Sequence, residues 1–241
     1  MSKEYTNKVI VVTGAGQGIG RELCVQLSSA GANVIAVSKS VAKLEELKNS
    51  CPAIDIIPIN LQNWQETRET LSKLPPIDGL INNAGVAIIK PFAELTEQNF
   101  DNTFDVNVKA VFNVTQTLLP KLKKGSSIVM VSSLAASRSF DGHILYSATK
   151  AAVDSLTRSL ALELGPKQIR VNSVNPTVVF TQMGRDIWSD PKKSGPLLAH
   201  IPLNRFCELQ EVIDGILYFL SSESSFVNGH HLNLEGGYLV S

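Results

Sequence analysis

The sequence has 241 residues, of which 44% are hydrophobic and only 18% are charged, so a large core can be buried and a disordered chain is excluded. Lys plus Arg equals Asp plus Glu at 22 each, which excludes the overall basic field that non-specific binding to nucleic acid or anionic membranes requires. No apolar run approaches the about 20 residues of a membrane span, and residues 1–5 lack the apolar stretch of a signal peptide, so we expect a cytoplasmic protein.

The cysteines argue for the same compartment. Cys24, Cys51 and Cys207 are odd in number, lie far apart and lack the spacing of metal ligands. This pattern fits reduced thiols better than a disulfide framework. We therefore expect all three to be packing residues, and we expect no metal site.

Short β-branched runs alternate with longer segments of helical periodicity along the whole chain. The expected strands are residues 8–12, 33–37, 54–59, 79–82, 127–131, 170–175 and 231–234. The expected helices are residues 18–30, 40–49, 64–74, 96–123, 146–164 and 208–220. Most of the strands are apolar on both faces, which predicts a parallel sheet covered by helices on both sides.

Strict alternation of strands and helices with right-handed crossovers leaves a doubly wound sheet or a closed barrel. Seven expected strands in 241 residues favour the open sheet. The prediction is a single α/β domain over residues 1–241 with a Rossmann-like, doubly wound, seven-stranded parallel sheet. The least periodic segment, 177–203, is longer than an ordinary connection and is expected to be a substrate loop or lid.

A glycine-rich turn, TGAGQGIG at residues 13–20, lies between the first strand and the first helix. Glycines let the backbone approach a pyrophosphate, and the helix N-terminus supplies N–H donors and a positive dipole end. A tight turn without a ligand is the alternative, but the strand before it and the helix after it favour nucleotide binding. The residues expected to contact the nucleotide here are Gly14, Gly16, Gln17, Gly18, Ile19, Gly20 and Arg21.

The second strand ends at Ser38-Lys39-Ser40, without the Asp or Glu that an NAD site places against the ribose hydroxyls. Lys39, with Arg21, could instead pair with a 2′-phosphate, so NADP(H) is the predicted cofactor. Two observations weaken this prediction. Either cation could simply be solvated at the surface, and Gln17 within the turn is uncharged.

Tyr146 and Lys150 open the fifth expected helix at positions i and i+4, so they share one face. A phenol has a reference pKa of about 10, and a nearby cation favours its phenolate form. Ser133 follows the strand at 127–131, which places a hydroxyl at the carboxyl edge where open α/β sheets bind ligands.

Together with NNAG at residues 82–85 and Asn107 in the fourth helix, these features make the chain similar to the classical short-chain dehydrogenase/reductase family over essentially its whole length. The resemblance implies that Tyr146 is the general acid toward a carbonyl oxygen, which Ser133 orients. It also implies that Asn107 holds a water molecule in a proton relay. Lys150 would lower the pKa of Tyr146 and bind the nicotinamide ribose. Donors placed near the carbonyl oxygen stabilise the negative charge that develops there.

The resemblance also implies further contacts with the cofactor. They fall on Ser38, Lys39, Asn60, Leu61, Asn83, Ala84, Gly85, Tyr146, Lys150, Pro176, Val179 and Thr181. Asn60 stands where the family usually has Asp beside adenine, which weakens that contact. Residues 175–178 (NPTV) replace the commoner Pro-Gly, and Asn82 could equally be a structural brace of the sheet.

Within the family, the chain is most similar to the branch that reduces L-xylulose to xylitol with NADPH and also reduces small α-dicarbonyls such as diacetyl. This likeness is carried by residues 51–52, 63–64, 161–166, 169–172, 175–179, 188–191 and 235–237.

His143 and Trp188 are expected at the substrate end of the cleft, although a surface histidine and a packing tryptophan are the alternatives. Leu134 and Phe140 make the wall near Ser133 apolar, which suits a dicarbonyl at least as well as a ketose. The preferred substrate therefore stays open.

Two other functions are compatible with the sequence. One is a family member that acts on a steroid, acyl-carrier or retinoid substrate, and the other is an NADP-binding sensor or scaffold without turnover. The intact set of Asn107, Ser133, Tyr146 and Lys150 argues against the sensor. The resemblance further implies a homotetramer with interfaces on the fourth and fifth helices and the C-terminal region. The apolar end of segment 235–241 could dock there or within its own subunit.

Overall fold

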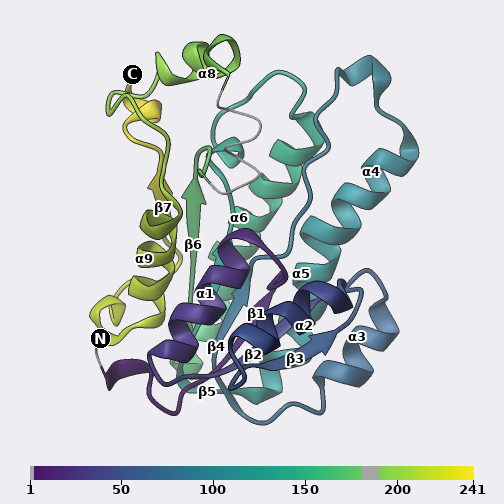
Figure 1. Ribbon diagram of the computed structural model, residues 1–241, viewed down its shortest axis with the longest axis vertical. Helices are drawn as coiled ribbons and strands as arrows, with labels where there is room; N and C mark the ends of the chain where they lie inside the picture. The colour runs from purple at the N-terminus through teal and green to yellow at the C-terminus, as the bar shows by residue number, and fades with distance from the viewer. Residues whose placement is uncertain (1–2, 181–189) are drawn as a thin grey trace.

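Seven parallel strands form the centre of the molecule, in the order β3-β2-β1-β4-β5-β6-β7. The computed structural model describes residues 3–180 and 190–241 (Figure 1). The strands are β1 (Val9–Thr13), β2 (Asn33–Ser38), β3 (Asp55–Pro58), β4 (Ile77–Asn82), β5 (Leu122–Val131), β6 (Arg170–Pro176) and β7 (His231–Leu234). The predicted doubly wound, seven-stranded α/β fold is confirmed.

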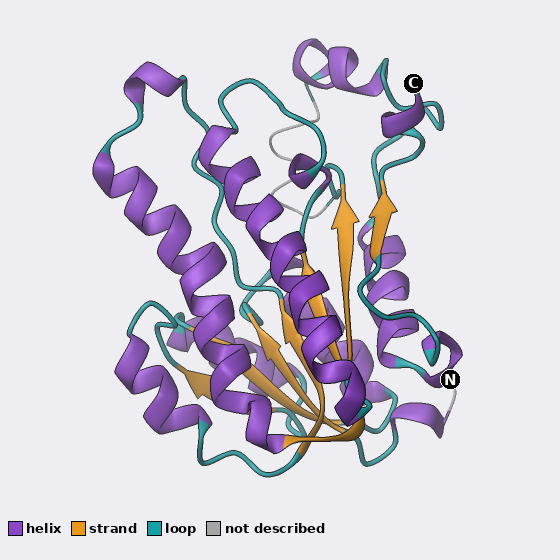
Figure 2. Ribbon diagram, turned by 180° about the vertical axis from the view of Figure 1, so that it is seen from behind, coloured by secondary structure: helices purple, strands orange, loops and turns teal. Residues whose placement is uncertain are grey.

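Helices cover both faces of this sheet (Figure 2). They are α1 (Gly18–Ser29), α2 (Val41–Ser50), α3 (Trp64–Leu71), α4 (Glu97–Phe104), α5 (Ala110–Leu118), α6 (Ile144–Leu164), α8 (Pro191–Leu198) and α9 (Leu209–Leu220). Among the described residues, no helix is both long enough and apolar enough to cross a membrane.

The strands are buried on both faces because alternate side chains enter two different cores. Ile10 and Val12 pack in one core with side chains of α1, α2 and α9, whereas Val11 between them packs in the other with side chains of α3, α5 and α6. This arrangement explains the continuous apolar runs of the sequence. Cys24 and Cys207 are buried in the first core, Cys51 packs against it, and all three thiols are free.

The helix predicted for residues 96–123 is wrong at its C-terminal end. The helical path runs through α4, a π-helical turn at Asp105–Lys109 and α5, and then ends in a 3-10 turn at Leu119–Lys121. Pro120 cannot donate a backbone hydrogen bond, which favours this early end. The next residues begin β5, where Leu122 pairs with Ile77 of β4.

The segment predicted to be irregular, 177–203, contains a helix, α8. Gly195 and Pro196 are poor helix formers and hid its periodicity, while Pro191 suits a helix start. Figures 1 and 2 show α8 and the C-terminus together beyond the carboxyl ends of β6 and β7. The described helix of this segment, α8, therefore lies at the edge of the sheet where a ligand is expected.

Replacing Leu44 with Ala should lower the free energy of unfolding by about 2–5 kcal/mol, because this side chain of α2 is fully buried and leaves a cavity. Val41→Ala on the same helix is the matched control. Val41 is 51% exposed, so its loss should cost about 0.5 kcal/mol or less. Urea denaturation followed by circular dichroism measures both, and equal effects would contradict the assigned burial of α2.

Candidate active site

A cavity of about 440 Å³ lies at the carboxyl ends of the strands around β1. It forms where the strand order reverses: β1 pairs with β2 on one side and with β4 on the other, so successive crossovers leave the sheet in opposite directions. Most of the predicted cofactor residues meet here. Those that line the cavity are Gly14, Gly16, Gln17, Gly18, Ser38, Lys39, Asn60, Leu61, Asn83, Ala84 and Gly85.

The glycine turn is packed too closely for side chains. Gly14 has a φ of +67°, and a Cβ there would lie 2.8 Å from Ala84 Cα. A Cβ on Gly16 would lie 2.9 Å from Ser38 Oγ. Gln17 caps α1 without a side-chain hydrogen bond, so the first N–H groups of the helix lack a side-chain acceptor from their cap. The turn thus fits the pyrophosphate of a dinucleotide.

Two lysines line the cavity beside the end of β2. Lys39 was predicted, whereas Lys43 was missed; the Lys43 ammonium donates a hydrogen bond to Gln17 Oε1. The available signal was its position, three residues after Ser40, whose side chain caps α2. No described residue that lines this cavity is acidic. The electrostatics therefore favour a ligand with an additional phosphate.

Arg21 does not line this cavity. Its guanidinium donates to Ser50 Oγ at 3.4 Å, at the C-terminal end of α2. The structure therefore does not bring Arg21 to the lysines with which it was grouped.

The other predicted cofactor residues have different positions. Gly20 and Ile19 lie in α1 outside the cavity lining, and a Cβ on Gly20 would lie 2.5 Å from Asn83 Nδ2, so Gly20 permits close packing of the turn. Val179 forms an isolated bridge with Cys207. Thr181 lies outside the described residues.

Asn107 lies in the π-helical turn between α4 and α5 and is 1% exposed. Its Nδ2 donates to Val86 O at 2.9 Å and to Thr149 Oγ1 at 3.0 Å, and its Oδ1 accepts from Val86 N at 2.8 Å. Both amide hydrogens are therefore used, and Oδ1 retains one lone pair. Gly85 connects this site to the cavity, because a Cβ on Gly85 would lie 3.4 Å from Asn107 Oδ1 and 3.6 Å from Lys150 Nζ.

Lys150 is buried in α6, where its ammonium donates to Val131 O at 2.8 Å and lies 5.5 Å from the centre of the Tyr146 ring. Burial lowers the pKa of Lys150 to about 8, and the carboxylate of Asp154 opposes this shift. A cation with this pKa still carries its charge at neutral pH.

Burial and a hydrogen bond shift the pKa of Tyr146, and the lowering of this pKa by Lys150 stays a prediction. Burial raises the pKa of Tyr146, and a hydrogen bond with Ser133 opposes that shift. Tyr146 is therefore protonated at neutral pH, as a proton donor must be.

Ser133 follows β5 and caps a 3-10 turn at Leu134–Ala136. Its Oγ accepts from Ala135 N at 3.1 Å, and its hydroxyl lies 3.5 Å from Pro176 O at the end of β6. This long contact leaves the hydroxyl able to rotate between Pro176, Tyr146 and a bound carbonyl group.

The substrate end is largely apolar. Leu134 packs with Ile201, Phe206 and Tyr238 in a buried cluster, which we call the substrate-side cluster, and Phe140 packs against it as predicted. The sequence did not indicate Ile201, Phe206 or Tyr238, because tertiary packing alone brings residues beyond 200 to this place.

His143 lies at the edge of this region. Its ring centre lies 6.4 Å from that of Tyr146 and 5.6 Å from that of Phe140, and its Nδ1 lies 2.7 Å from Asp141 O. The structure therefore brings His143 beside Tyr146. Trp188, the other predicted substrate residue, lies outside the described residues.

Known proteins resemble the chain over nearly its full length. L-xylulose reductase of Mesocricetus auratus is 46% identical over 233 residues, covering 95% of this chain and 96% of the relative. Carbonyl reductase [NADPH] 2 of Sus scrofa is 41% identical, covering all of both chains. A Beutenbergia cavernae protein crystallised with NADP at low occupancy has a TM-score of 0.91 at 25% identity, covering 99% of each chain. With the family model for short chain dehydrogenases matching residues 8–192, these similarities show that the chain belongs to the short chain dehydrogenase family.

Proposed function

We propose that the protein is an NADPH-dependent carbonyl reductase that transfers hydride to a small ketose or α-dicarbonyl, with L-xylulose, which is reduced to xylitol, and diacetyl as substrates. One observation carries the proposal: Asn107, Ser133, Tyr146 and Lys150 lie at one edge of the sheet, next to a cavity with two lysines and no described acidic residue. The L-xylulose reductase and NADPH-named relatives support this substrate class and cofactor.

The cavity fits a dinucleotide with a 2′-phosphate. The glycine turn and the N-terminus of α1 would bind the pyrophosphate, and Asn60 and Leu61 would contact the adenine. Lys39 and Lys43 would pair with the 2′-phosphate. Lys150 would bond the nicotinamide ribose, while Pro176, Val179 and Thr181 would contact the nicotinamide end. When bound, NADPH supplies the hydride.

In the proposed mechanism, negative charge develops on the carbonyl oxygen as the substrate is reduced. Ser133 Oγ donates a hydrogen bond to this oxygen, and Tyr146 gives it the phenolic proton. The Lys150 ammonium, 5.5 Å from the Tyr146 ring, stabilises the phenolate that results. The free lone pair of Asn107 Oδ1 would hold the water molecule through which Tyr146 regains its proton.

The substrate end supports a small ligand. The substrate-side cluster offers an apolar wall, and His143 beside Tyr146 would bond a hydroxyl or second carbonyl group of the substrate. Trp188 is proposed as a further substrate contact.

We also propose that residues 1–241 act as one domain in a cytoplasmic homotetramer. Free thiols at all three cysteines support a reducing compartment.

Exposed apolar side chains support the assembly of subunits: Phe112 is 45% exposed on α5, and Leu162 is 82% exposed on α6. At the C-terminus, Tyr238 is buried within its own subunit, whereas Val240 is exposed.

Replacing Tyr146 with Phe should lower kcat for L-xylulose and diacetyl by about 10²–10⁴, since it removes the proton donor. NADPH binding, followed by fluorescence, should survive. Tyr218→Phe, at an exposed position of α9, is the matched control.

An assay of ketoses, dicarbonyls and hydroxysteroids with both cofactors identifies the substrate class. Full activity of Tyr146→Phe would contradict the mechanism, and a preference for steroids would contradict the substrate assignment.

Lys39→Asp should raise KM for NADPH by at least about tenfold and shift the preference toward NADH, because a hydrogen bond to a charged group contributes about 1.5–3 kcal/mol. Lys43→Met should have a smaller effect in the same direction. Lys48→Met, on the same helix but outside the cavity lining, should leave the ratio of kcat/KM for the two cofactors unchanged. An unchanged ratio in Lys39→Asp would refute the phosphate contact.

Sedimentation velocity should give a mass four times the 26.1 kDa of one chain. Phe112→Asp should produce smaller species, because a carboxylate cannot be buried cheaply in an apolar interface. A monomeric wild-type protein would exclude the tetramer.

A further inference from the structure

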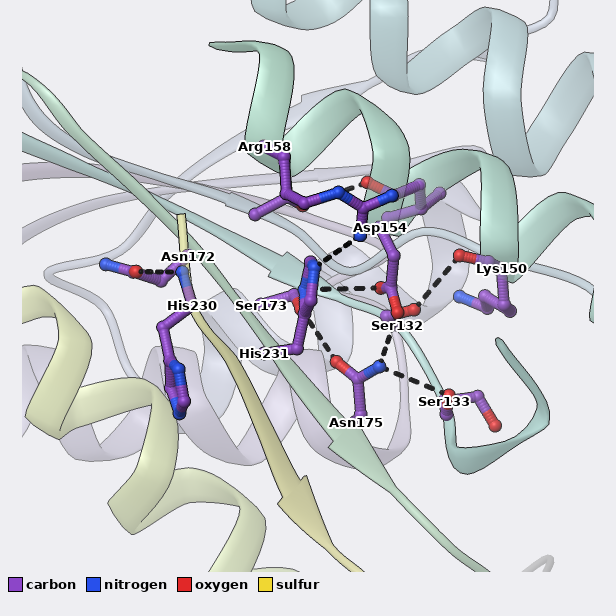
Figure 3. A network of polar contacts seen from close by, with 12 residues as sticks. Ser132, Ser133, Lys150, Asp154, Arg158, Asn172, Ser173, Asn175, His230 and His231 are labelled. Atoms are coloured by element: carbon purple, nitrogen blue, oxygen red, sulfur yellow. Dashed lines mark hydrogen bonds and ion pairs between the residues drawn. The ribbon is translucent and has the colours of Figure 1, made fainter. Parts of the chain in front are cut away.

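A line of polar side chains connects the exposed side of α6 to the buried surroundings of Lys150 (Figure 3). Arg158 Nη1 lies 2.8 Å from His231 Nε2, and His231 Nδ1 lies 2.7 Å from Ser173 Oγ. Ser173 Oγ lies 2.7 Å from Asn175 Oδ1, and Asn175 Nδ2 lies 2.8 Å from Asp154 Oδ2. These residues come from α6, β6 and β7. The line leaves α6 at Arg158, passes through β7 and β6, and returns to α6 at Asp154.

The chemistry of its two ends determines the direction of every hydrogen bond. Asp154 only accepts, so Asn175 must present its Nδ2 to it and its Oδ1 to Ser173. Ser173 therefore donates to Asn175 and accepts from His231 Nδ1–H. Since Arg158 only donates, His231 Nε2 must accept. His231 is thus neutral with its proton on Nδ1, in agreement with a pKa lowered mainly by burial, with Arg158 acting in the same direction.

Asp154 lies one helical turn after Lys150 in α6 and is buried. Its Oδ1 has no hydrogen-bond partner; His231 Nδ1 is 3.7 Å away and bonds to Ser173 instead. A buried carboxylate with one oxygen unsatisfied is costly unless a charge compensates it. Lys150 is a buried cation one turn away on the same helix, and the Asp154 carboxylate favours its charge.

The same carboxylate is connected to Ser133. Asn175 Nδ2, which donates to Asp154, also lies 3.4 Å from Ser133 O. Asn175 therefore joins the end of β6 to the residue that follows β5 at the reaction site. Both of these partners accept hydrogen bonds, so together they fix the orientation of the Asn175 amide.

We propose that Asp154 is a positioning residue of the active site: it keeps the Lys150 ammonium charged and, through Asn175, holds Ser133 in place. The inference rests on the proposed role of Lys150. Arg158, His231 and Ser173 continue this line of hydrogen bonds to the exposed side of α6. Arranged in one direction, these bonds polarise one another.

The charged and titratable groups around Asp154 come from two elements in the described part of the chain. Lys150 and Arg158 lie on its own helix, and His231, with His230 beside it, comes from β7. From β6, the neutral Ser173 and Asn175 face it. Of these, Lys150 is the buried cation whose protonation is tied to the reaction.

The test is the pH dependence of kcat/KM for carbonyl reduction. The ammonium is present below the Lys150 pKa of about 8 and is lost above it, so wild-type activity should fall as pH rises through this region. Asp154→Asn removes the stabilising charge with little change in shape. The alkaline limb of the profile, where kcat/KM falls as the pH rises, should therefore move to lower pH by about one unit or more. Asp154→Glu should return it toward the wild-type position.

Asp214→Asn, the same change at an exposed position of α9, should leave the profile unchanged. Equal loss of activity at every pH in Asp154→Asn, with the limb unmoved, would show a merely structural role and overturn the proposal. Absence of carbonyl reduction by the wild-type protein would instead show that the proposed function itself is wrong, which separates the two failures.

Two measurements do not depend on the folding of Asp154→Asn. Asn175→Ala retains every charge but removes the amide that bonds to Asp154 and Ser133, so kcat should fall a few-fold; unchanged kcat would remove the connection to Ser133. In the wild-type enzyme, ¹⁵N NMR of histidine should find His231 neutral at pH 7 with its proton on Nδ1. A proton on Nε2, or a charged ring, would overturn the assigned direction of the line.

Discussion

The reversal of strand order beside β1 is the constraint on which the rest of the molecule depends. Because β2 and β4 flank β1, the helices that follow β1 and β4 diverge and leave an opening at the carboxyl ends of the strands. The glycine turn, the two lysines and the loop at Asn83–Gly85 all line this one opening. Parallel pairing also brings the ends of β5 and β6 to the same edge, which is why Ser133 and Pro176 meet there.

Burial of ionisable groups next to this opening determines their chemistry. Desolvation disfavours charge, so it raises the pKa of Tyr146 and lowers that of Lys150. The raised pKa makes Tyr146 a weaker acid, and the lowered pKa disfavours the Lys150 cation that would stabilise its phenolate. A group that favours the charged form of Lys150 therefore assists proton transfer. Asp154 provides that compensation from one turn along the same helix. A reductase that needs a neutral phenol and a charged amine can therefore keep the amine buried and the phenol half-buried.

The fold could be predicted from the sequence because continuous apolar strands and helical periodicity are local signals that tertiary packing confirms. The glycine turn was also recognisable from its place between a strand and a helix, and Asn107, Ser133, Tyr146 and Lys150 were recognisable from the resemblance to the family. What failed depended on long-range contacts or weak local signals. The end of the fourth helix was set by β-pairing of Leu122, and α8 was hidden by two poor helix formers. The substrate-side cluster and the line from Arg158 to Asp154 depend on contacts between residues far apart in the sequence, which no local pattern predicts.

The central claim is that this chain delivers hydride from NADPH to a carbonyl carbon. Its most direct test is reduction of L-xylulose by the purified protein with NADPH deuterated at both C4 positions of the nicotinamide, followed by mass spectrometry and NMR of the product. The account predicts xylitol with one deuterium, bonded to the former carbonyl carbon. Xylitol without deuterium, or no reduction of any small ketose or dicarbonyl, would contradict it.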